Sequence, residues 1–322
     1  MNTPYLFLVN PFSGAGGGEK IASMLEKILP GRPVLREGIG EVVLINQIDD
    51  DRLRALLSRV EVVVVVGGDG TVSHLIPHIL ECLSPPAIGL IPLGTSNDLA
   101  RTLGVSVDEN YTDESTLKRA VEGLLNARET KLDILSVNDK LFFCNYFSIG
   151  LDAAIVRDFH RVRGSRWVKL LPAGRLTNNV LYFFMGLRNA GFCIEPPVEI
   201  TFTGEDRERR ITIESRCRAI IIGNLPFYAG GCPLCPQAQK DDGMFEITVV
   251  WSAYQYIMLI ATRFLRFLRL PRGMSQYRAR RATISMASRS PFQIDGEKGT
   301  DTGSLPSTLT FSVHASLRVL VP

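Results

Sequence analysis

Three glycines and one aspartate follow a run of five valines, and together they could hold the phosphate groups of a nucleotide. The run Val62–Val66 continues into Gly67-Gly68-Asp69-Gly70-Thr71. Glycine has no Cβ atom, so such a turn can bring backbone N–H groups close to phosphate oxygens. Valines without polar alternation are typical of a strand buried on both faces. We expect phosphate binding at the carboxyl end of this strand, unless the turn has only a structural role.

A helix is expected from Ser73 to Cys82, directly after this glycine loop, and its N-terminus would also favour anions. Two further strand-end loops carry similar residues: Pro11–Gly18 after a buried strand Tyr5–Asn10, and Leu93–Asp98 after Ala87–Pro92. Strands that alternate with helices predict a parallel sheet whose strand-end loops meet at one edge. We therefore expect one shared site, although the first loop could also be a flexible connection.

The first of these loops does not follow the two familiar phosphate-binding patterns. Glu19-Lys20-Ile21 stands where the Walker A pattern needs Gly-Lys-Ser/Thr, and Glu19 stands where the dinucleotide pattern needs glycine. If this loop approaches a nucleotide, it does so through backbone groups and not through either of those motifs.

The two parts of the chain differ in charge and in strand pattern. Residues 1–135 hold 12 Lys and Arg against 18 Asp and Glu, a balance of −6, so the other residues hold +9 of a net charge of +3. Alternating strands such as Val198–Phe202 begin only after this point and predict an antiparallel sheet with one wet face. We expect an α/β domain at 1–135 and a β-rich domain at 136–309, with about 310–322 returning to the first domain.

The sequence shows no signal peptide and no evident membrane span. The longest uncharged stretch near the C-terminal half, Ile247–Thr262, is short for a span and is expected to join a strand to a helix. Six scattered cysteines favour reduced thiols, and the pair Cys232 and Cys235 lacks the further ligands of a zinc site. These features predict a cytoplasmic protein.

Two basic segments, 157–175 and 263–281, could lie against an anionic membrane. The first holds six basic residues against one acid, and no acid occurs from Trp251 to Ile294. Arginines among aromatic and leucine side chains suit a membrane surface, where each basic group contributes about 1 kcal/mol. The alternative is a solvated helix face. No binding motif for nucleic acid accompanies the basic residues, so no nucleic acid partner is expected. The oligomeric state stays open, a homo-oligomer included.

The chain resembles the bacterial lipid kinases related to diacylglycerol, sphingosine and ceramide kinases. The resemblance covers nearly the whole chain, and the order and spacing of its motifs make it specific. The motifs are Asn10–Gly14, Gly67–Thr71, Pro92–Asp98, Asn145–Asp152, Ala229–Pro236, Asp242-Gly243 and Asp295-Gly296-Glu297. NAD kinases and phosphofructokinases share the glycine–aspartate loop but lack the later motifs. The resemblance implies an N-terminal nucleotide-binding α/β domain with a mostly parallel sheet, a C-terminal, mainly antiparallel β-sandwich domain, and an active-site cleft between them.

The resemblance also implies which residues contact ATP. They belong to the strand-end loops and are Asn10, Ser13, Asn46, Gly67, Gly68, Asp69, Gly70, Thr71, Val72, Ser73, Gly94, Thr95 and Asn97. Asn46 stands where relatives often have a threonine. Ser73-His74 departs from the Asn-Glu that is usual in the family, so the phosphate contacts at these two positions are expected to differ from those of relatives.

Two magnesium sites and a general base are implied in the same way. The catalytic Mg2+ would lie among Asp69, Asp98 and Asp133, and a separate structural Mg2+ would be held by Gln239, Asp242 and Met244. Glu297 matches the general base, and Asp69 is its rival. Without the resemblance, Asp295-Gly296 is simply a strong hairpin-turn signal.

Phosphoryl transfer from ATP fits these residues chemically. The reaction needs neutralised phosphate charge, in-line positioning and an acceptor that loses its proton. Glycine-loop amides and Mg2+ meet the first need, and a carboxylate such as Glu297 can take the proton of a primary alcohol. We expect a peripherally membrane-associated kinase that phosphorylates a lipid alcohol, with diacylglycerol giving phosphatidic acid. The alternatives are a soluble-substrate kinase of the NAD kinase type and a non-catalytic lipid-binding regulator with the same fold.

Overall fold

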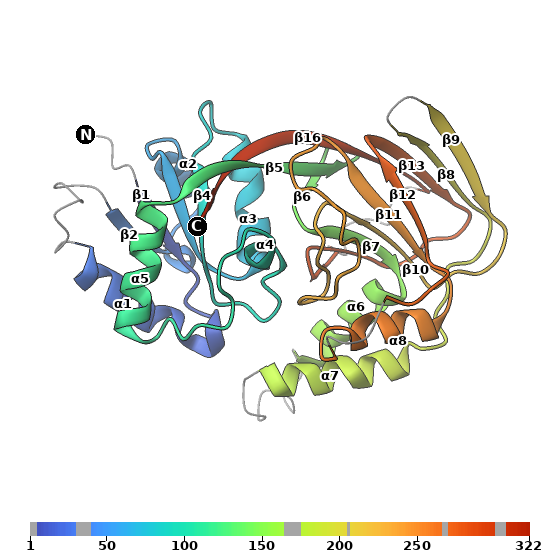
Figure 1. The fold of residues 1–322 in the computed structure, drawn as a ribbon, viewed down its shortest axis with the longest axis horizontal. Helices are drawn as coiled ribbons and strands as arrows, with labels where there is room; N and C mark the ends of the chain where they lie inside the picture. Colours follow the sequence, from blue (N-terminus) through green and yellow to red (C-terminus); the bar gives the residue numbers. More distant parts are fainter. Residues whose placement is uncertain (1–4, 30–39, 164–174, 205–206, 266–269, 300–306) are drawn as a thin grey trace. The chain divides into compact units, whose positions relative to one another are not determined.

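The computed structural model describes residues 5–29, 40–163, 175–204, 207–265, 270–299 and 307–322. Two compact units divide the chain (Figure 1). The first contains residues 1–132 and 315–322, and the second contains residues 133–314.

Parallel strands form the centre of the first unit. They are β1 (Tyr5–Val9), β2 (Gly40–Leu44), β3 (Val62–Gly67) and β4 (Ala87–Pro92), in the order β2-β1-β3-β4. The last part of β16 (Thr308–Val321) extends this sheet, because Val319 pairs in parallel with Ile88 of β4. Every residue of β3 is buried, as the valine run predicts.

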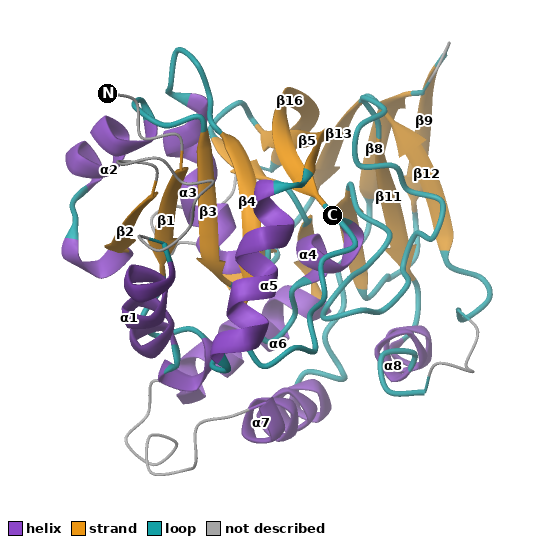
Figure 2. Ribbon diagram, turned by 60° about the vertical axis from the view of Figure 1, so that its left-hand side comes forward, coloured by secondary structure: helices purple, strands orange, loops and turns teal. Residues whose placement is uncertain are grey.

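Helices cover both faces of this sheet (Figure 2). Val62, Val64 and Val66 share one hydrophobic cluster with α1 (Gly18–Ile28) and α5 (Glu114–Leu125). On the other face lie α2 (Asp50–Leu57) and α3 (Asp69–Leu80). The short helix α4 (Asp98–Thr102) follows β4, and single 3-10 turns, η1 (Gly14–Gly16) and η2 (Ile45–Gln47), follow β1 and β2.

The helix expected from Ser73 begins four residues earlier, at Asp69, so this prediction was wrong at its start. Gly68 is still extended, with φ −108° and ψ −176°, and Thr71 already donates its backbone N–H to the Gly68 carbonyl oxygen at 2.9 Å. Gly70 and Thr71 are poor helix formers, so the sequence did not predict the first turn of this helix. Asp69 therefore lies in the first turn of α3.

Antiparallel strands form two sheets in the second unit, as predicted. One sheet has the order β12-β11-β10-β7-β14-β15, and the other joins the first part of β16 to β13, β8 and β9, with β5 and β6 beside it. The strands are β5 (Arg128–Val137), β6 (Leu141–Phe143), β7 (Tyr146–Gly150), β8 (Val198–Thr203), β9 (Glu208–Ile213), β10 (Ala219–Gly223), β11 (Phe245–Val250), β12 (Ser275–Ala279), β13 (Arg281–Met286), β14 (Phe292–Ile294) and β15 (Glu297–Lys298).

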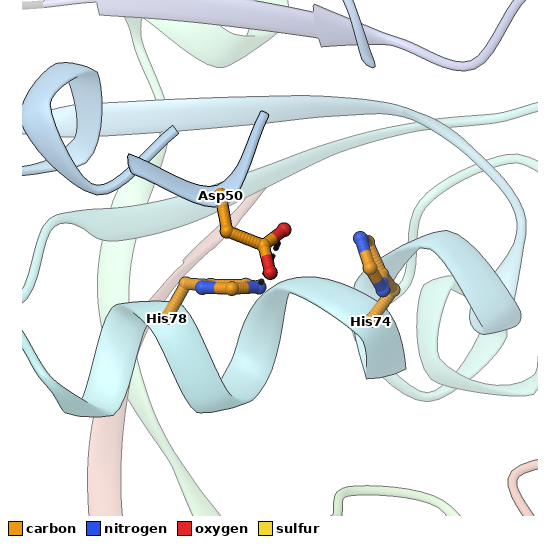
Figure 3. A group of neighbouring side chains, drawn as sticks. All are labelled: Asp50, His74 and His78. Atoms are coloured by element: carbon orange, nitrogen blue, oxygen red, sulfur yellow. Dashed lines mark ion pairs between the residues drawn. The ribbon is translucent and has the colours of Figure 1, made fainter. Parts of the chain in front are cut away.

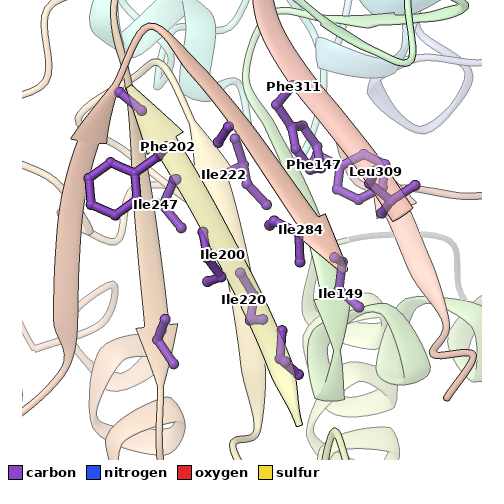
Figure 4. Packing of buried hydrophobic residues seen from close by; sticks show 14 of the residues in the cluster. Phe147, Ile149, Ile200, Phe202, Ile220, Ile222, Ile247, Ile284, Leu309 and Phe311 are labelled. Carbon is purple, nitrogen blue, oxygen red and sulfur yellow. The ribbon is translucent and has the colours of Figure 1, made fainter. Parts of the chain in front are cut away.

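The inward side chains of the two sheets form one hydrophobic core (Figure 4). Phe147, Ile220 and Ile247 come from one sheet, and Ile200 and Ile284 come from the other. Strand β8 alternates buried and half-buried residues, as its sequence predicts. The opposite face of the β7–β10–β11 sheet packs against α6 (Leu151–Arg163), α7 (Arg175–Arg188) and α8 (Ala253–Ala261) in a second cluster.

Phe147 offers a direct test of this core. Its ring stacks on Phe292 at 5.5 Å between centroids and meets Phe311 edge-on at 5.2 Å. Phe147→Ala should lower the free energy of unfolding by about 3–5 kcal/mol, because it leaves a cavity among fixed rings. Urea unfolding of both proteins measures the difference. Leu83→Ala is the control, because Leu83 is fully exposed and should change stability by less than about 0.5 kcal/mol. Equal effects of the two variants would contradict the described packing.

Candidate functional site

The backbones of the loops after β3 and β4 touch each other. A Cβ atom on Gly68 would lie 2.9 Å from the Gly94 Cα atom, and one on Gly94 would lie 2.6 Å from the Gly68 Cα atom. Leu93 donates its N–H to the Gly67 carbonyl oxygen at 2.8 Å. Only glycine fits at such a close approach, so two of the strand-end loops that the sequence grouped do meet.

Asn10 joins the loop after β1 to the same place. The side-chain nitrogen of Asn10 donates to the Thr71 hydroxyl at 2.9 Å, and its side-chain oxygen accepts the Phe12 N–H at 3.0 Å. A Cβ atom on Gly18 would collide with the Asn10 carbonyl oxygen, so this glycine lets α1 begin directly against the end of β1. The loop is thus held by contacts of its own and by α3.

Asp69 uses its carboxylate to hold the start of α4. One oxygen accepts the Asp98 N–H at 2.9 Å, and the other accepts the Leu99 N–H at 3.3 Å. Asn97 precedes them in the left-handed region, with φ 52°, and donates its side-chain amide to the Gly94 carbonyl oxygen at 2.8 Å. The aspartate that the sequence assigned to chemistry therefore also fixes the shape of the neighbouring loop.

The other predicted nucleotide residues lie on these loops with different exposure. Asn46 in η2 and Thr95 after β4 are exposed, whereas Ser13 and Ser73 are half-buried. Val72 is only 3% exposed and packs into the core, so its backbone alone could serve a ligand. The N-terminus of α3 lies at the glycine loop, where its orphan N–H groups and positive dipole end suit phosphate.

Carboxylates of the first unit fit a magnesium ion by donor type. Asp69 and Asp98 lie next to each other on neighbouring loops, and the Asp98 side chain is fully buried. Hard carboxylate oxygens are the donors that Mg2+ prefers.

Asp133, the third predicted magnesium ligand, belongs to the second unit. It is buried, and its carboxylate accepts the Gly243 N–H at 2.6 Å. Its backbone also donates to the Lys240 carbonyl oxygen at 2.7 Å and accepts from the Asn224 side chain at 2.9 Å. Asp133 thus anchors the 240–243 loop, whatever else it binds.

The predicted structural metal site has a different arrangement here. Asp242 accepts the Met244 N–H at 2.9 Å and forms an ion pair with Arg278, while Gln239 is exposed. Burial, with the charge of Asp242 second, raises the pKa of the neighbouring Glu246 to about 7. Because a guanidinium already neutralises Asp242, a cation at Gln239, Asp242 and Met244 would have to displace it, and this site stays a prediction.

The Asp-Gly-Glu motif is a hairpin turn with a second role. Asp295 and Gly296 both have positive φ, at 49° and 85°, and β14 pairs with β15 across them. The buried Asp295 carboxylate accepts backbone N–H groups of Asn145 and Tyr146 at 3.0 and 2.9 Å. The turn is therefore bound to the start of β7, and it presents Glu297 at the first position of β15.

A buried polar network supports this turn from behind. Gly296 donates its N–H to the Gln293 side-chain oxygen at 2.7 Å, and the Gln293 amide donates to Asp152 at 2.9 Å. Ser148 and Tyr256 also donate to Asp152, each at 2.6 Å. Burial, followed by the charge of Asp152, raises the pKa of Tyr256 well above its ordinary value, so it remains a neutral donor.

Glu297 itself is exposed and lies beside a histidine. Its carboxylate is 3.6 Å from Nε2 of His160 on α6, and 61% of its side chain is exposed. An accessible carboxylate of this kind can accept a proton from a bound hydroxyl.

The sequence did not point to His160, Gln293 or Tyr256. A lone histidine or tyrosine on an amphipathic helix carries no motif, and Gln293 lies in an ordinary short strand. Asp152 belongs to the motif Asn145–Asp152, although its partners could be found only from the fold.

The cysteine pair is buried and remains as thiols. All six cysteines lie in the described ranges, and none of them forms a disulfide bond. Burial raises the pKa of Cys235 to about 12, and its sulfur lies 3.4 Å from the Thr248 hydroxyl. Among the described residues, Cys232 and Cys235 belong to no group of three or more side chains that could hold a metal ion, and a structural zinc site needs four ligands.

Two family models match adjacent parts of the chain. The diacylglycerol kinase catalytic domain matches residues 4–137, and the diacylglycerol kinase accessory domain matches residues 142–298.

Individual relatives carry the same description. The eye-specific diacylglycerol kinase of Drosophila melanogaster is 29% identical over 91% of this chain but only 21% of its own length. The diacylglycerol kinase of Staphylococcus carnosus is 26% identical over 79% of this chain and 74% of its own length. The chain thus spans about a fifth of the first relative.

A solved structure extends this likeness to the fold. The crystal structure of a diacylglycerol kinase from Bacillus anthracis has a TM-score of 0.61 and 18% identity, and it covers 99% of this chain and 97% of its own. At this identity the likeness concerns the fold alone.

The contact between the two glycine loops predicts the effect of a single methyl group. Gly68→Ala should weaken ATP binding measured by calorimetry and destabilise the protein by about 1–3 kcal/mol, since the methyl group forces the loops apart. Gly123→Ala is the matched control, because nothing lies within 4 Å of a Cβ atom there. In the last turn of α5 that change should stabilise the protein by up to about 1 kcal/mol. Unchanged ATP affinity and stability in Gly68→Ala would show that the loops do not need this approach.

Proposed function

We propose that this chain, which belongs to the diacylglycerol kinase family, transfers the γ-phosphoryl group of ATP to the hydroxyl group of a membrane lipid. Diacylglycerol, giving phosphatidic acid, is the acceptor that we propose. The matches to both the catalytic and the accessory domain support this reading over a kinase of the NAD kinase type.

One observation carries the proposal more than any other. The touching backbones of Gly68 and Gly94 lie at the N-terminal end of α3, beside two aspartates. A bend of this kind offers backbone amides to phosphate without side chains in the way. Turn geometry alone does not explain why two separate loops should both need glycine.

The reaction can be written with the groups of this chain. The lipid oxygen attacks the γ-phosphorus, an O–P bond forms, the bond to the β-phosphate oxygen breaks, and ADP leaves. Glycine-loop amides and the α3 N-terminus would hold the phosphates, and Mg2+, when bound at Asp69, Asp98 and the predicted third ligand Asp133, would neutralise their charge. Glu297 would accept the proton of the hydroxyl group.

Glu297 is better suited than Asp69 to act as the base. Both oxygens of Asp69 already accept N–H groups of α4, so a proton there would disturb the loop. Glu297 has an exposed carboxylate on a turn that Asp295 holds in place. A proton acceptor requires both a fixed position and an accessible carboxylate, and Glu297 has both.

The surface of α7 and α8 favours a lipid as the acceptor. Large apolar side chains are exposed on and just after these helices: Val180, Phe183, Phe184, Leu187, Tyr254, Ile257, Phe264 and Leu265. Both helices pack on the same side of one sheet. An apolar patch of this kind, with Arg188 and Arg263 nearby in the sequence, suits the surface of an anionic membrane.

Some arginines of the two predicted basic segments have partners within the protein. Arg157 pairs with Asp158, Arg263 donates to the Ala229 carbonyl oxygen, and Arg278 pairs with Asp242. Residues 164–174 and 266–269 of these segments lie outside the described residues. Within the described ranges, no helix combines the length and the apolar character needed to cross a bilayer.

Lipid phosphorylation can be tested with Glu297→Gln. Purified protein with Mg-ATP and vesicles that contain diacylglycerol should yield labelled phosphatidic acid, and the variant should lose about 10²–10⁴-fold in kcat. ATP affinity should stay unchanged, because the amide keeps the size of the carboxylate. Glu208→Gln, an exposed change on β9, should retain full activity. ATP binding without a labelled lipid would favour the non-catalytic regulator, and a labelled soluble metabolite would favour the soluble-substrate kinase.

Membrane contact through α7 can be tested separately. The double variant Phe183→Ser/Phe184→Ser should bind anionic vesicles at least about tenfold more weakly in a sedimentation assay, since each buried phenylalanine contributes about 1.5–3 kcal/mol. Leu83→Ser is the control, because it replaces an even more exposed apolar residue of the first unit. Equal vesicle binding by both variants would exclude α7 as the contact.

A further inference from the structure

Two histidines and one aspartate meet between α2 and α3, and none of the three has been assigned a role in catalysis (Figure 3). His74 and His78 are four residues apart on α3, so both lie on the same side of the helix. Asp50 is the first residue of α2 and faces them. One ligand atom from each of the three residues lies within 4.8 Å of the other two.

The three side chains are almost close enough to one another to bind a single metal ion. Nε2 of His78 is 3.8 Å from the Asp50 carboxylate, and the two imidazole centroids are 5.7 Å apart. A tetrahedral ion with bonds of about 2.0–2.1 Å brings its ligand atoms to about 3.4 Å from one another. Asp50 and His74 are exposed, so rotation of their side chains can close the remaining gap.

The surroundings set Asp50 apart from the acids beside it. Asp49 caps α2 by accepting the Arg52 N–H at 2.8 Å, and Asp51 pairs with Arg54 at 2.6 Å. Asp50 alone of these three consecutive aspartates turns to the histidines. The Nδ1 atom of His78 is buried and has no hydrogen-bond partner in the described part of the chain. The other ring nitrogen, Nε2, is the one that faces Asp50.

A nearby thiol does not join the group. Cys82 follows His78 by one more helical turn and donates its S–H to the His78 carbonyl oxygen at 3.4 Å. The Cys82 sulfur does not belong to the group of ligand atoms that lie within 4.8 Å of one another. The ligand set is therefore two imidazoles and one carboxylate.

We propose that Asp50, His74 and His78 form a binding site for Zn2+, with water as the fourth ligand. Imidazole nitrogen suits zinc, whereas Mg2+ prefers oxygen donors, so this site differs in kind from the predicted magnesium sites. The ion would join the first turn of α2 to α3. Since α3 begins with Asp69 and carries Thr71, the metal would steady the helix that supports the glycine loop.

The binding test uses the full chain, stripped with EDTA and kept reduced. Zn2+ titrated by calorimetry should saturate at one ion per chain in the presence of excess Mg2+. His74→Gln should weaken zinc affinity at least about tenfold, since it removes one of three ligands. Because His74 is exposed, this variant should keep the circular dichroism spectrum of the parent.

His314→Gln is the matched control. His314 is exposed and packs at a tilt against Phe142 in the second unit, so its loss should leave zinc affinity unchanged. Co2+ in place of Zn2+ should give the visible absorption of a tetrahedral ion in the parent and in His314→Gln but not in His74→Gln. Zinc should also raise the melting temperature of the parent by more than that of His74→Gln.

Two results would overturn the proposal. If no zinc binds, or if His74→Gln binds zinc as tightly as the parent, Asp50 and His78 form only an ion pair between two helices. The catalytic carboxylates are intact in every variant, so the comparison does not depend on whether the kinase function is correct.

Discussion

The carboxylate of Asp69 is the interaction on which the first unit's candidate site depends. It lies in the first turn of α3 and accepts two backbone N–H groups at the start of α4. These bonds join the loop after β3 to the loop after β4, and the close approach of Gly68 and Gly94 is possible only with that alignment. A charged acceptor on backbone amides is roughly twice as strong as a neutral one. The carboxylate therefore holds the two loops in a fixed relation, which would lower the ordering cost of the proposed nucleotide binding.

The second unit is organised around a different acid. Asp295 accepts backbone N–H groups at the start of β7, and Gln293 connects the same turn to Asp152 and Tyr256. Each member of this network is buried and satisfied by another, which makes the turn rigid. Tyr256 lies on α8, the helix that also exposes Tyr254 and Ile257. The surface proposed to meet lipid is thus connected by hydrogen bonds to the turn that carries Glu297.

The sequence allowed the architecture to be predicted because its signals were local. The valine run required a strand covered on both faces, and the alternation in Val198–Phe202 required a sheet with one face in the core. The start of α3 was missed because glycine and threonine conceal a helical turn. Gln293, His160 and Tyr256 could not be found from the sequence, because their roles arise from neighbours that are distant along the chain. The hairpin predicted at Asp295-Gly296 is confirmed by the pairing of β14 with β15, whereas the role of Glu297 stays a prediction.

The sheet of the first unit is completed by β16, a strand that comes late in the sequence. Its first residues pair with β13 in the second unit, whereas Val319 pairs with Ile88 of β4 in the first unit. Leu317, Val319 and Leu320 are all buried there. During synthesis, strands β1 to β4 therefore appear before the residues of β16 that pair with β4. An open edge of a hydrophobic sheet invites pairing with other chains, so nascent copies of this protein are expected to need protection until β16 has emerged.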